Sequence, residues 1–106
     1  MTQELHRGEV WWATVPGDKT RPVLLLTREP FVPHLSTLLV APITTTVRSI
    51  PTEVPLGVDD GLPRSCAANF DNVFTLHRSR FERFIGRLGD DRMGEVCRAY
   101  RFAAGC

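Results

Sequence analysis

The chain has 106 residues, which is enough for one modest hydrophobic core and too few for two, so we expect a single domain over residues 1–106. Hydrophobic residues make up 42% and charged residues 24% of the sequence, which excludes a disordered or fibrous chain. The net charge of +1 does not by itself indicate a nucleic-acid partner.

The start of the chain and the cysteines bear on the compartment in which the protein works. No apolar run approaches the roughly 20 residues of a membrane-spanning helix, and residues 1–7 contain no hydrophobic signal region. We therefore expect a cytoplasmic protein without a membrane segment. The cysteines, Cys66, Cys97 and Cys106, are odd in number and lack CxxC spacing, which predicts neither a disulfide framework nor a zinc site. We expect Cys66 and Cys97 to be buried free thiols.

The chain from residue 9 to residue 77 predicts a series of short strands. These segments are rich in β-branched and aromatic residues and are separated by proline, glycine and aspartate turn signals. The nearly continuous apolar run of residues 21–27 predicts a strand buried on both faces, and Pro42 predicts an edge position or a bulge in the third strand. The predicted strands cover residues 9–15, 21–27, 38–46, 52–56, 65–70 and 73–77.

The end of the chain predicts a change from strand to helix. Residues 81–88 predict a short helical turn that leads into a strand around Phe84. In the helix that follows, Asp90 or Asp91 can cap the N-terminus and Gly105 ends the element. Its apolar stripe is predicted to consist of Met93, Val96, Cys97, Tyr100 and Ala104. Short strands before one terminal helix predict a mainly β fold, a small barrel of bent antiparallel sheet with the helix over an opening.

The residue types available for chemistry are mainly arginine and threonine. The GxSxG, HExxH and GxxxxGK[ST] motifs are absent, and His6, His34 and His77 are too scattered to predict a metal site, so we expect no metal and no cofactor. Of the 13 basic residues only Lys19 is a lysine. Arginine offers a planar fork of donors that binds phosphate through two hydrogen bonds. Arginine and threonine donors suit the stabilisation of an anionic phosphorane.

Three segments in order carry a resemblance to a known family: residues 7–12 (RGEVWW), 20–26 (TRPVLLL) and 40–46 (VAPITTT). Residues 52–55 (TEVP), the pair Asp71 and Asn72, and residues 85–88 (IGRL) ahead of the terminal helix extend it over nearly the whole chain. Together they resemble the MazF/PemK toxins, and mycobacterial members most of all. The resemblance implies an SH3-like barrel that forms a homodimer, cleaves single-stranded RNA by attack of a 2′-hydroxyl on the adjacent phosphate, and is neutralised by a cognate antitoxin.

The resemblance also implies which residues carry catalysis. The arginine before the second-strand proline corresponds to Arg21, and a threonine at the end of the third strand corresponds to Thr44, with Thr45 as the alternative in register. Arg21 would neutralise the phosphate, and the threonine hydroxyl would donate to a non-bridging oxygen. Arginine stays protonated in almost any site, so a role as simple general base is not expected. Without the resemblance, Arg21 would be interpreted as a solvated arginine at a strand edge.

Further residues are predicted to contact RNA. Thr45 and Arg48 follow the third strand, although Arg48 is equally a solvated edge residue. Asn72 stands where the family often has a glutamine that touches bases, and a turn-forming amide is the equal alternative. The loop of residues 16–20 (PGDKT) is shorter than in many members of the family, which leaves Asp18 and Lys19 to supply its contacts. A role for the loop residue His34 is a minority hypothesis.

Two other functions fit a small barrel of this kind. A gyrase poison of the CcdB type shares the barrel and the dimer, but such toxins rely on a C-terminal Trp-Gly-Ile, whereas this chain ends in Ala-Ala-Gly-Cys and contains the Arg21-Pro22 element that they lack. A non-catalytic SH3-like module that binds protein or RNA is the second alternative, because the fold alone does not determine function.

Overall fold

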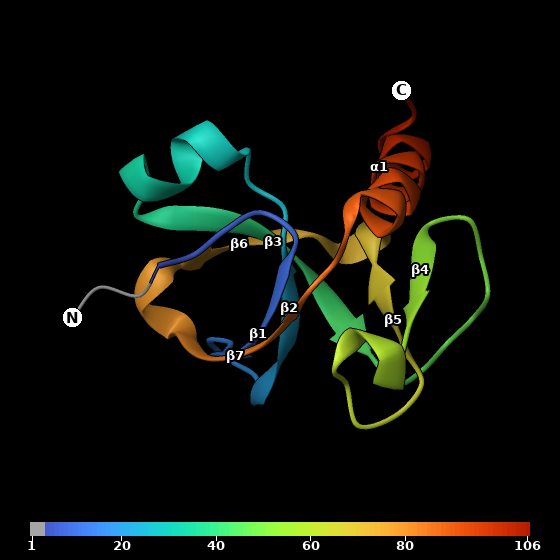
Figure 1. Ribbon diagram of the computed structural model, residues 1–106, viewed down its shortest axis with the longest axis horizontal. Coiled ribbons are helices and arrows are strands. Elements are labelled where there is room, and N and C mark those ends of the chain that lie inside the picture. The colour runs from blue at the N-terminus through green and yellow to red at the C-terminus, as the bar shows by residue number, and fades with distance from the viewer. Residues whose placement is uncertain (1–3) are drawn as a thin grey trace.

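A computed structural model of the protein describes residues 4–106 and confirms a mainly β fold with one C-terminal helix (Figure 1). The strands are β1 (Glu9–Thr14), β2 (Thr20–Leu25), β3 (Thr37–Thr44), β4 (Glu53–Leu56), β5 (Cys66–Asn69), β6 (Phe74–His77) and β7 (Phe81–Arg87). Short 3-10 turns connect them at η1 (Glu29–His34), η2 (Val58–Asp60), η3 (Phe70–Asn72) and η4 (Arg78–Arg80), and the chain closes with the helix α1 (Asp90–Ala104). The helix is too short and too polar to cross a membrane, and no other helix of the described residues could do so.

The strands form one strongly curled antiparallel sheet in the order β4-β5-β3-β2-β1-β7, with β6 paired to β3. The strand β3 has three partners. It pairs with β2 along one edge, and along the other edge with β6 over residues 37–40 and then with β5 at Ile43 and Thr44. The switch of partner bends the sheet into a half-barrel, since β2, β1 and β7 continue one way and β5 and β4 the other (Figure 1).

Of the two predictions for Pro42, an edge position or a bulge, the edge position is wrong, because β3 lies inside the sheet. Pro42 pairs with Val23 of β2, and on its other side it lies between the residues paired with β6 and those paired with β5. The ladder is already interrupted there, so a residue without an N–H group is tolerated. Pro42 therefore marks a break in the hydrogen-bond ladder along one side of β3, and β3 is not an edge strand.

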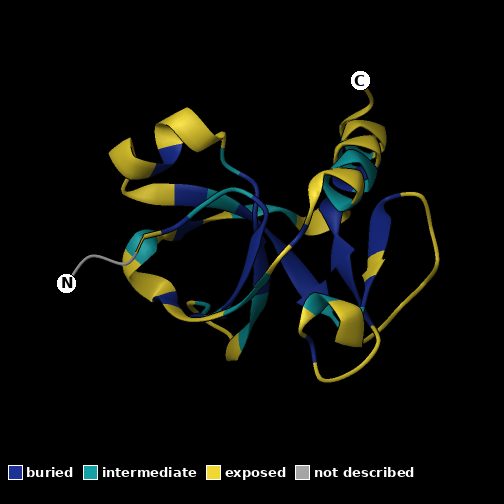
Figure 2. Cartoon of the chain, viewed as in Figure 1, coloured by how far each residue is buried: buried dark blue, intermediate teal, exposed yellow. Residues whose placement is uncertain are grey.

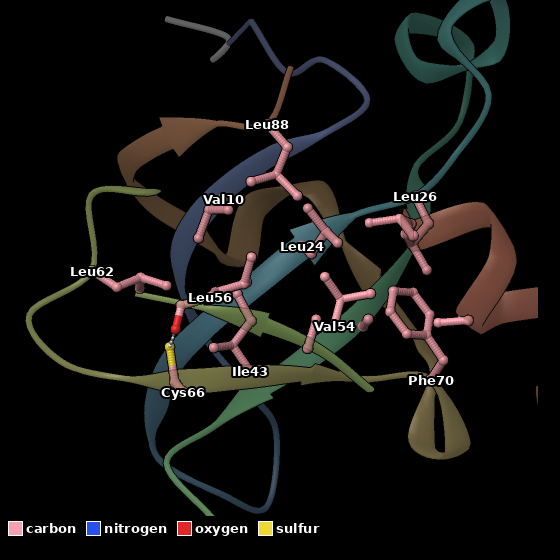
Figure 3. Close-up of a cluster of buried hydrophobic side chains, with 14 residues drawn as sticks. Val10, Leu24, Leu26, Ile43, Val54, Leu56, Leu62, Cys66, Phe70 and Leu88 are labelled. Atoms are coloured by element: carbon pink, nitrogen blue, oxygen red, sulfur yellow. Dashed lines mark hydrogen bonds between the residues drawn. The ribbon is translucent and has the colours of Figure 1, made fainter. Parts of the chain in front are cut away.

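The residues of the central strands are largely buried (Figure 2), and apolar side chains form a cluster on each face of these strands. One cluster includes Leu24, Ile43 and Val54 (Figure 3). Val96 of α1 belongs to the same cluster. The other cluster includes Val23 and Leu25 of the same strand as Leu24, together with Trp11, Val40 and Phe81 on neighbouring strands. This confirms the prediction that the second strand is buried on both faces. Trp11 is buried and Trp12 only half-buried, as the alternation of a strand requires.

Replacing Phe81 by alanine should destabilise the protein by about 3–5 kcal/mol, because the truncation removes a ring from a packed core and leaves a cavity. Phe81 is 1% exposed and contacts Trp11 edge to face at 6.2 Å between ring centroids. The matched control is Phe84→Ala on the same strand, where the ring is 49% exposed and meets Trp11 at 5.8 Å. That change should cost about 1 kcal/mol. Urea denaturation measures both, and equal losses would contradict the assignment of Phe81 to the core.

Several details of the C-terminal region correct the sequence predictions. Residues 81–87 are entirely strand, and the helical turn precedes them as η4. The N-cap of α1 is Gly89 without a side-chain hydrogen bond, while Asp90 and Asp91 lie in the first turn, where they favour the helix dipole without capping it. The buried stripe runs through Val96 and Ala99, so Cys97, which was predicted to be buried, is exposed.

The segment before β1 is tied to η1 by a histidine between two carboxylates. His6 Nδ1 lies 2.5 Å from Oε1 of Glu29, and Nε2 lies 2.9 Å from Oε1 of Glu4. The hydrogen bond to Glu29, followed by the one to Glu4, raises the pKa of His6 above its ordinary value of 6.5. The hydrogen bond from His6 in turn lowers the pKa of Glu29 below its ordinary value of 4.5.

The His6–Glu29 pair should therefore stabilise the protein most between about pH 4.5 and 6.5. The contribution of His6 is complete below 6.5 and is lost as the pH rises through its raised pKa. The contribution of Glu29 is complete above 4.5 and is lost as the pH falls through its lowered pKa. Both side chains are partly exposed, so the difference in unfolding free energy between wild type and His6→Ala should stay below about 1 kcal/mol. Urea titrations from pH 4 to 9 check the prediction, and a difference that grows above pH 8 would contradict it.

Candidate active site

The end of the sheet at which β2 begins carries Arg21, the first predicted catalytic residue. Arg21 pairs with Ala13 of β1, and its Nη2 atom forms an ion pair with Oδ2 of Asp18 at 2.9 Å. Its Nε atom is buried and has no hydrogen-bond partner within residues 4–106. A buried donor without a partner costs about 1–3 kcal/mol, so such donors in folded proteins need an explanation. A ligand could reach only the rest of the side chain, which is 30% exposed.

The short turn between β1 and β2 orients Asp18 toward Arg21. Gly17 has a φ of 77°, a left-handed conformation that glycine adopts without steric cost, and the N–H of Asp18 donates to the carbonyl of Val15 at 3.0 Å. The N–H of Lys19 donates to Oδ1 of Asp18 at 2.8 Å, which fixes the carboxylate while the Lys19 side chain remains exposed. The ion pair between Asp18 and Arg21 was missed in the sequence, although their spacing of three residues was a signal for it.

Thr44, the second predicted catalytic residue, is the half-buried last residue of β3. Its Oγ1 accepts the N–H of Thr46 at 3.1 Å, which leaves the hydroxyl proton free for another acceptor. Thr45 and Thr46 lie beyond the strand and are exposed, so the third strand is shorter than predicted. The hydrogen bond from Thr46 gives the Thr44 hydroxyl a fixed orientation.

Arg21 and Thr44 lie at the same end of the sheet on strands that separate from one another. The last pair between β2 and β3 is Val23 with Pro42, and the same register two residues further would set Thr44 opposite Arg21. The pairing with β2 ends before that point, and β3 diverges from β2 (Figure 1), while on its other edge Thr44 pairs with Ala67 of β5. No hydrogen bond joins the two side chains within the described part of the chain.

Arg48 lies in the exposed loop between β3 and β4. The N–H groups of Arg48 and Ser49 both donate to Oε1 of Glu53, at 2.9 and 3.1 Å. The Arg48 guanidinium forms no ion pair with an acidic residue among residues 4–106. The buried Glu53 was not singled out in the sequence, although a carboxylate in a short segment that is otherwise largely apolar was the available signal.

Asn72 is the exposed last residue of η3, in agreement with the predicted bend at Asp71 and Asn72. The Asn69 side chain accepts the N–H of Asp71 at 2.9 Å and thereby caps the turn. The hydroxyl of Thr52 donates to Oδ2 of Asp71 at 2.6 Å. The β4 segment next to the Arg48 loop is thus bonded to the turn that carries Asn72.

The predicted site residues therefore form two groups. Lys19 lies in the turn between β1 and β2, and Arg21 lies at the start of β2. Arg48 is linked to Glu53 by a hydrogen bond, and Asp71, the neighbour of Asn72, is linked to Thr52. Thr44 and the adjacent Thr45 connect the two groups along the chain. No hydrogen bond or ion pair joins the two groups among residues 4–106.

The histidines lie outside both groups. His34 and His6 line a hollow of about 750 Å³ that includes neither Arg21 nor Thr44. His77 lines a second hollow of about 480 Å³, together with Thr14, Ser79 and Arg80. Among residues 4–106, no group of three or more histidine, cysteine, aspartate or glutamate side chains could hold a metal ion.

Known proteins resemble the chain over nearly its whole length. Residues 6–103 match the family described as PemK-like, MazF-like toxin of type II toxin-antitoxin system. Among curated proteins, "Probable endoribonuclease MazF2" of Mycobacterium tuberculosis is 41% identical over 103 residues, which is 96% of this chain and 100% of the relative. "Probable endoribonuclease MazF5" of the same species is 40% identical over 107 aligned positions, covering 100% of this chain and 98% of the relative.

Solved structures agree with these relatives. The structure titled "Mycobacterium tuberculosis toxin MazF-mt6" superposes with a TM-score of 0.86 at 39% identity, over 92% of this chain and 96% of that one. The structure titled "Endoribonuclease in complex with its cognate antitoxin from Mycobacterial species" gives 0.85 at 27% identity, over 96% of each chain. The chain belongs to the PemK-like, MazF-like family of toxins of type II toxin-antitoxin systems.

Proposed function

We propose that the protein is an endoribonuclease toxin that cleaves single-stranded RNA at short sequences. The observation that carries this proposal is the similarity, over 96% of the chain, to a relative at 41% identity that is named as an endoribonuclease. The alternative of a gyrase poison has no counterpart among these relatives. The non-catalytic module is likewise disfavoured, because the relatives are named as enzymes.

In the proposed reaction, Arg21 and Thr44 stabilise the transition state. The Arg21 side chain is 30% exposed, and its guanidinium, which is paired with Asp18 through Nη2, can also donate to a phosphate oxygen. Thr44 Oγ1 is oriented by the Thr46 N–H and can donate its proton to a non-bridging oxygen. Donors that are already in place where negative charge develops lower the barrier without reorganisation during the reaction.

We propose that the nucleophile is the 2′-hydroxyl of the RNA and that no metal ion takes part. The hydroxyl lies beside the phosphate, so the attack is intramolecular and proximity offsets much of the barrier. As the 2′-oxygen bonds to phosphorus, the bond to the 5′-oxygen of the next nucleotide breaks. The products are a 2′,3′-cyclic phosphate and a 5′-hydroxyl.

The RNA on either side of the cut would contact both groups of residues. Lys19 lies beside Arg21 in the first turn, and its exposed ammonium group can approach a phosphate. Thr45, Arg48 and Asn72 are exposed and can contact bases or phosphates further along the strand. Phosphate contacts of this kind position the RNA, and contacts to base edges select the sequence.

The proposed partners are a cognate antitoxin and a second copy of the chain. One structural neighbour is titled as a complex with its cognate antitoxin. We propose that the protein works in the cytoplasm, because a toxin that cleaves cellular RNA meets its substrate there. A homodimer would cover some of the exposed apolar side chains, such as Phe84 and Phe102. We expect sedimentation at micromolar concentration to show a dimer, and a monomer that cleaves RNA would contradict this expectation.

Incubation of the purified protein with single-stranded RNA in excess EDTA tests the function. We expect defined fragments at unchanged rate when EDTA is present. Loss of cleavage in EDTA that magnesium restores would contradict the metal-independent mechanism. Intact RNA together with inhibited gyrase would favour the gyrase poison, and RNA binding without products would favour the non-catalytic module.

A further inference from the structure

Two loops that carry proposed RNA contacts are fixed by consecutive residues at the start of β4. The loop between β3 and β4 carries Arg48, and η3 carries Asn72. Thr52 and Glu53 are each 8% exposed, and they are two of only four buried polar residues among residues 4–106. Burial of a carboxylate and a hydroxyl is unfavourable unless both groups are hydrogen-bonded.

Glu53 determines the path of the loop that contains Arg48. Its Oε1 atom accepts two consecutive backbone N–H groups, of Arg48 and Ser49. Ser49 has a φ of 55° and is the only residue other than glycine with a positive φ among residues 4–106. That conformation is unfavourable for most side chains, and hydrogen bonds to a carboxylate are stronger than those to neutral acceptors. The Glu53 carboxylate therefore stabilises a loop shape that the loop residues alone would not favour.

Thr52 determines the position of η3. Its hydroxyl donates to the Asp71 carboxylate, and its carbonyl accepts the N–H of Phe70 at 2.9 Å. These bonds attach both ends of the Phe70–Asp71 step to β4, immediately before Asn72. Because Thr52 and Glu53 are neighbours, a short rigid segment connects the two loops.

We propose that Thr52 and Glu53 are positioning residues that fix the two loops relative to one another and so determine how tightly, and at which sequence, RNA is bound. The proposal rests on the proposed function. Neither residue touches the reacting atoms, since Glu53 acts through the backbone of Arg48 and Thr52 acts through Asp71. Their removal should weaken RNA binding and broaden sequence preference, while the chemical step at Arg21 is largely retained.

The central test compares Glu53→Ala with Glu53→Gln on a single-stranded oligoribonucleotide that the wild type cuts. Glutamine keeps a side-chain oxygen that can accept both N–H groups, whereas alanine leaves them without their acceptor. We expect Glu53→Ala to raise KM about tenfold and to change kcat by less than about threefold. Glu53→Gln should stay within about threefold of the wild type in both constants. Sequencing of cleavage ends should show additional cut sequences only for the alanine variant.

The corresponding pair for the second loop is Thr52→Val and Thr52→Ser. Valine keeps the shape and loses the hydroxyl, so KM should rise, whereas serine keeps the hydroxyl and should restore it. Asp60→Ala is the matched control, because the Asp60 carboxylate also accepts a loop N–H, that of Gly57 at 3.0 Å, but after β4 and away from both loops. We expect Asp60→Ala to lower stability without raising KM.

A folded Glu53→Ala protein with wild-type KM and cut sequences, or a Glu53→Gln protein as impaired as Glu53→Ala, would overturn the inference. If Glu53→Ala does not fold, Glu53→Asp provides the same test, since its shorter side chain keeps the charge and withdraws the acceptor. Hydrogen exchange of the Arg48 and Ser49 amides should be at least about tenfold faster in the disrupting variant than in wild type and Glu53→Gln. This measurement needs no RNA. A wild type that leaves RNA intact would contradict the proposed function, whereas unchanged exchange would contradict the inference alone.

Discussion

Replacement of Arg21 by alanine should lower the rate of RNA cleavage about a hundredfold or more, because a positioned cation stabilises charge that appears only in the transition state. The protein should remain folded. Arg21 is the second residue of β2, and its side chain is 30% exposed, so truncation opens no large cavity. Its ion pair with Asp18 involves a carboxylate that is itself 40% exposed and can be solvated. Single-turnover cleavage together with thermal unfolding measures the two effects separately.

Two control variants separate the contribution of the guanidinium from that of charge alone. Arg21→Lys keeps the charge and loses the planar fork, so it should recover only part of the lost rate. Lys19→Ala removes an exposed charge from the same turn and should change cleavage by less than about tenfold, as expected for a phosphate contact away from the reacting atoms. Near-normal cleavage by a folded Arg21→Ala protein would contradict the assignment of the active site.

A single 2′-O-methyl group on the nucleotide before the cut should abolish cleavage at that position. The modification leaves the phosphate and the base unchanged but removes the nucleophile. An attack from bulk water would forfeit the advantage of proximity, which reaches about 7–11 kcal/mol in well-oriented intramolecular reactions. The same group placed on the following nucleotide is the control and should leave a measurable rate. Mass spectrometry of the unmodified products should find a cyclic phosphate, and cutting at the blocked sugar would contradict the mechanism.

The periodicity of the sequence was sufficient to predict the strands, since alternating and continuous apolar runs depend on neighbours in the chain. It was insufficient where partners are distant. For Pro42 an edge position and a bulge both remained open, because the sequence does not reveal that β3 changes partner there. Cys97 was predicted to be buried because its helical spacing places it beside the apolar side chains of α1. Which residues at the edge of that apolar face are buried depends on how α1 packs against the sheet, and the sequence does not show this.

The catalytic roles of Arg21 and Thr44 rest on the resemblance and stay predictions. The resemblance led to Arg21 and Thr44, and the structure places both at one end of the sheet. The roles of Glu53 and Thr52 were not predicted, because they depend on hydrogen bonds across loops that fold back on β4. The type of a residue gives little indication that its side chain acts by holding the backbone of another residue.

The three partners of β3 also constrain the order in which the protein can fold. The pairing of β2 with β3 needs only a short loop, but β6 reaches β3 across more than 30 residues, and β7 reaches β1 across about 70. Closing such long loops loses chain entropy before any contact compensates for it, so folding of this topology is expected in milliseconds to seconds rather than microseconds. During synthesis, β1 cannot gain its second neighbour until the ribosome has passed Arg87. A nascent chain that already carries Arg21 and Thr44 therefore still lacks β7, the strand that completes the pairing of β1.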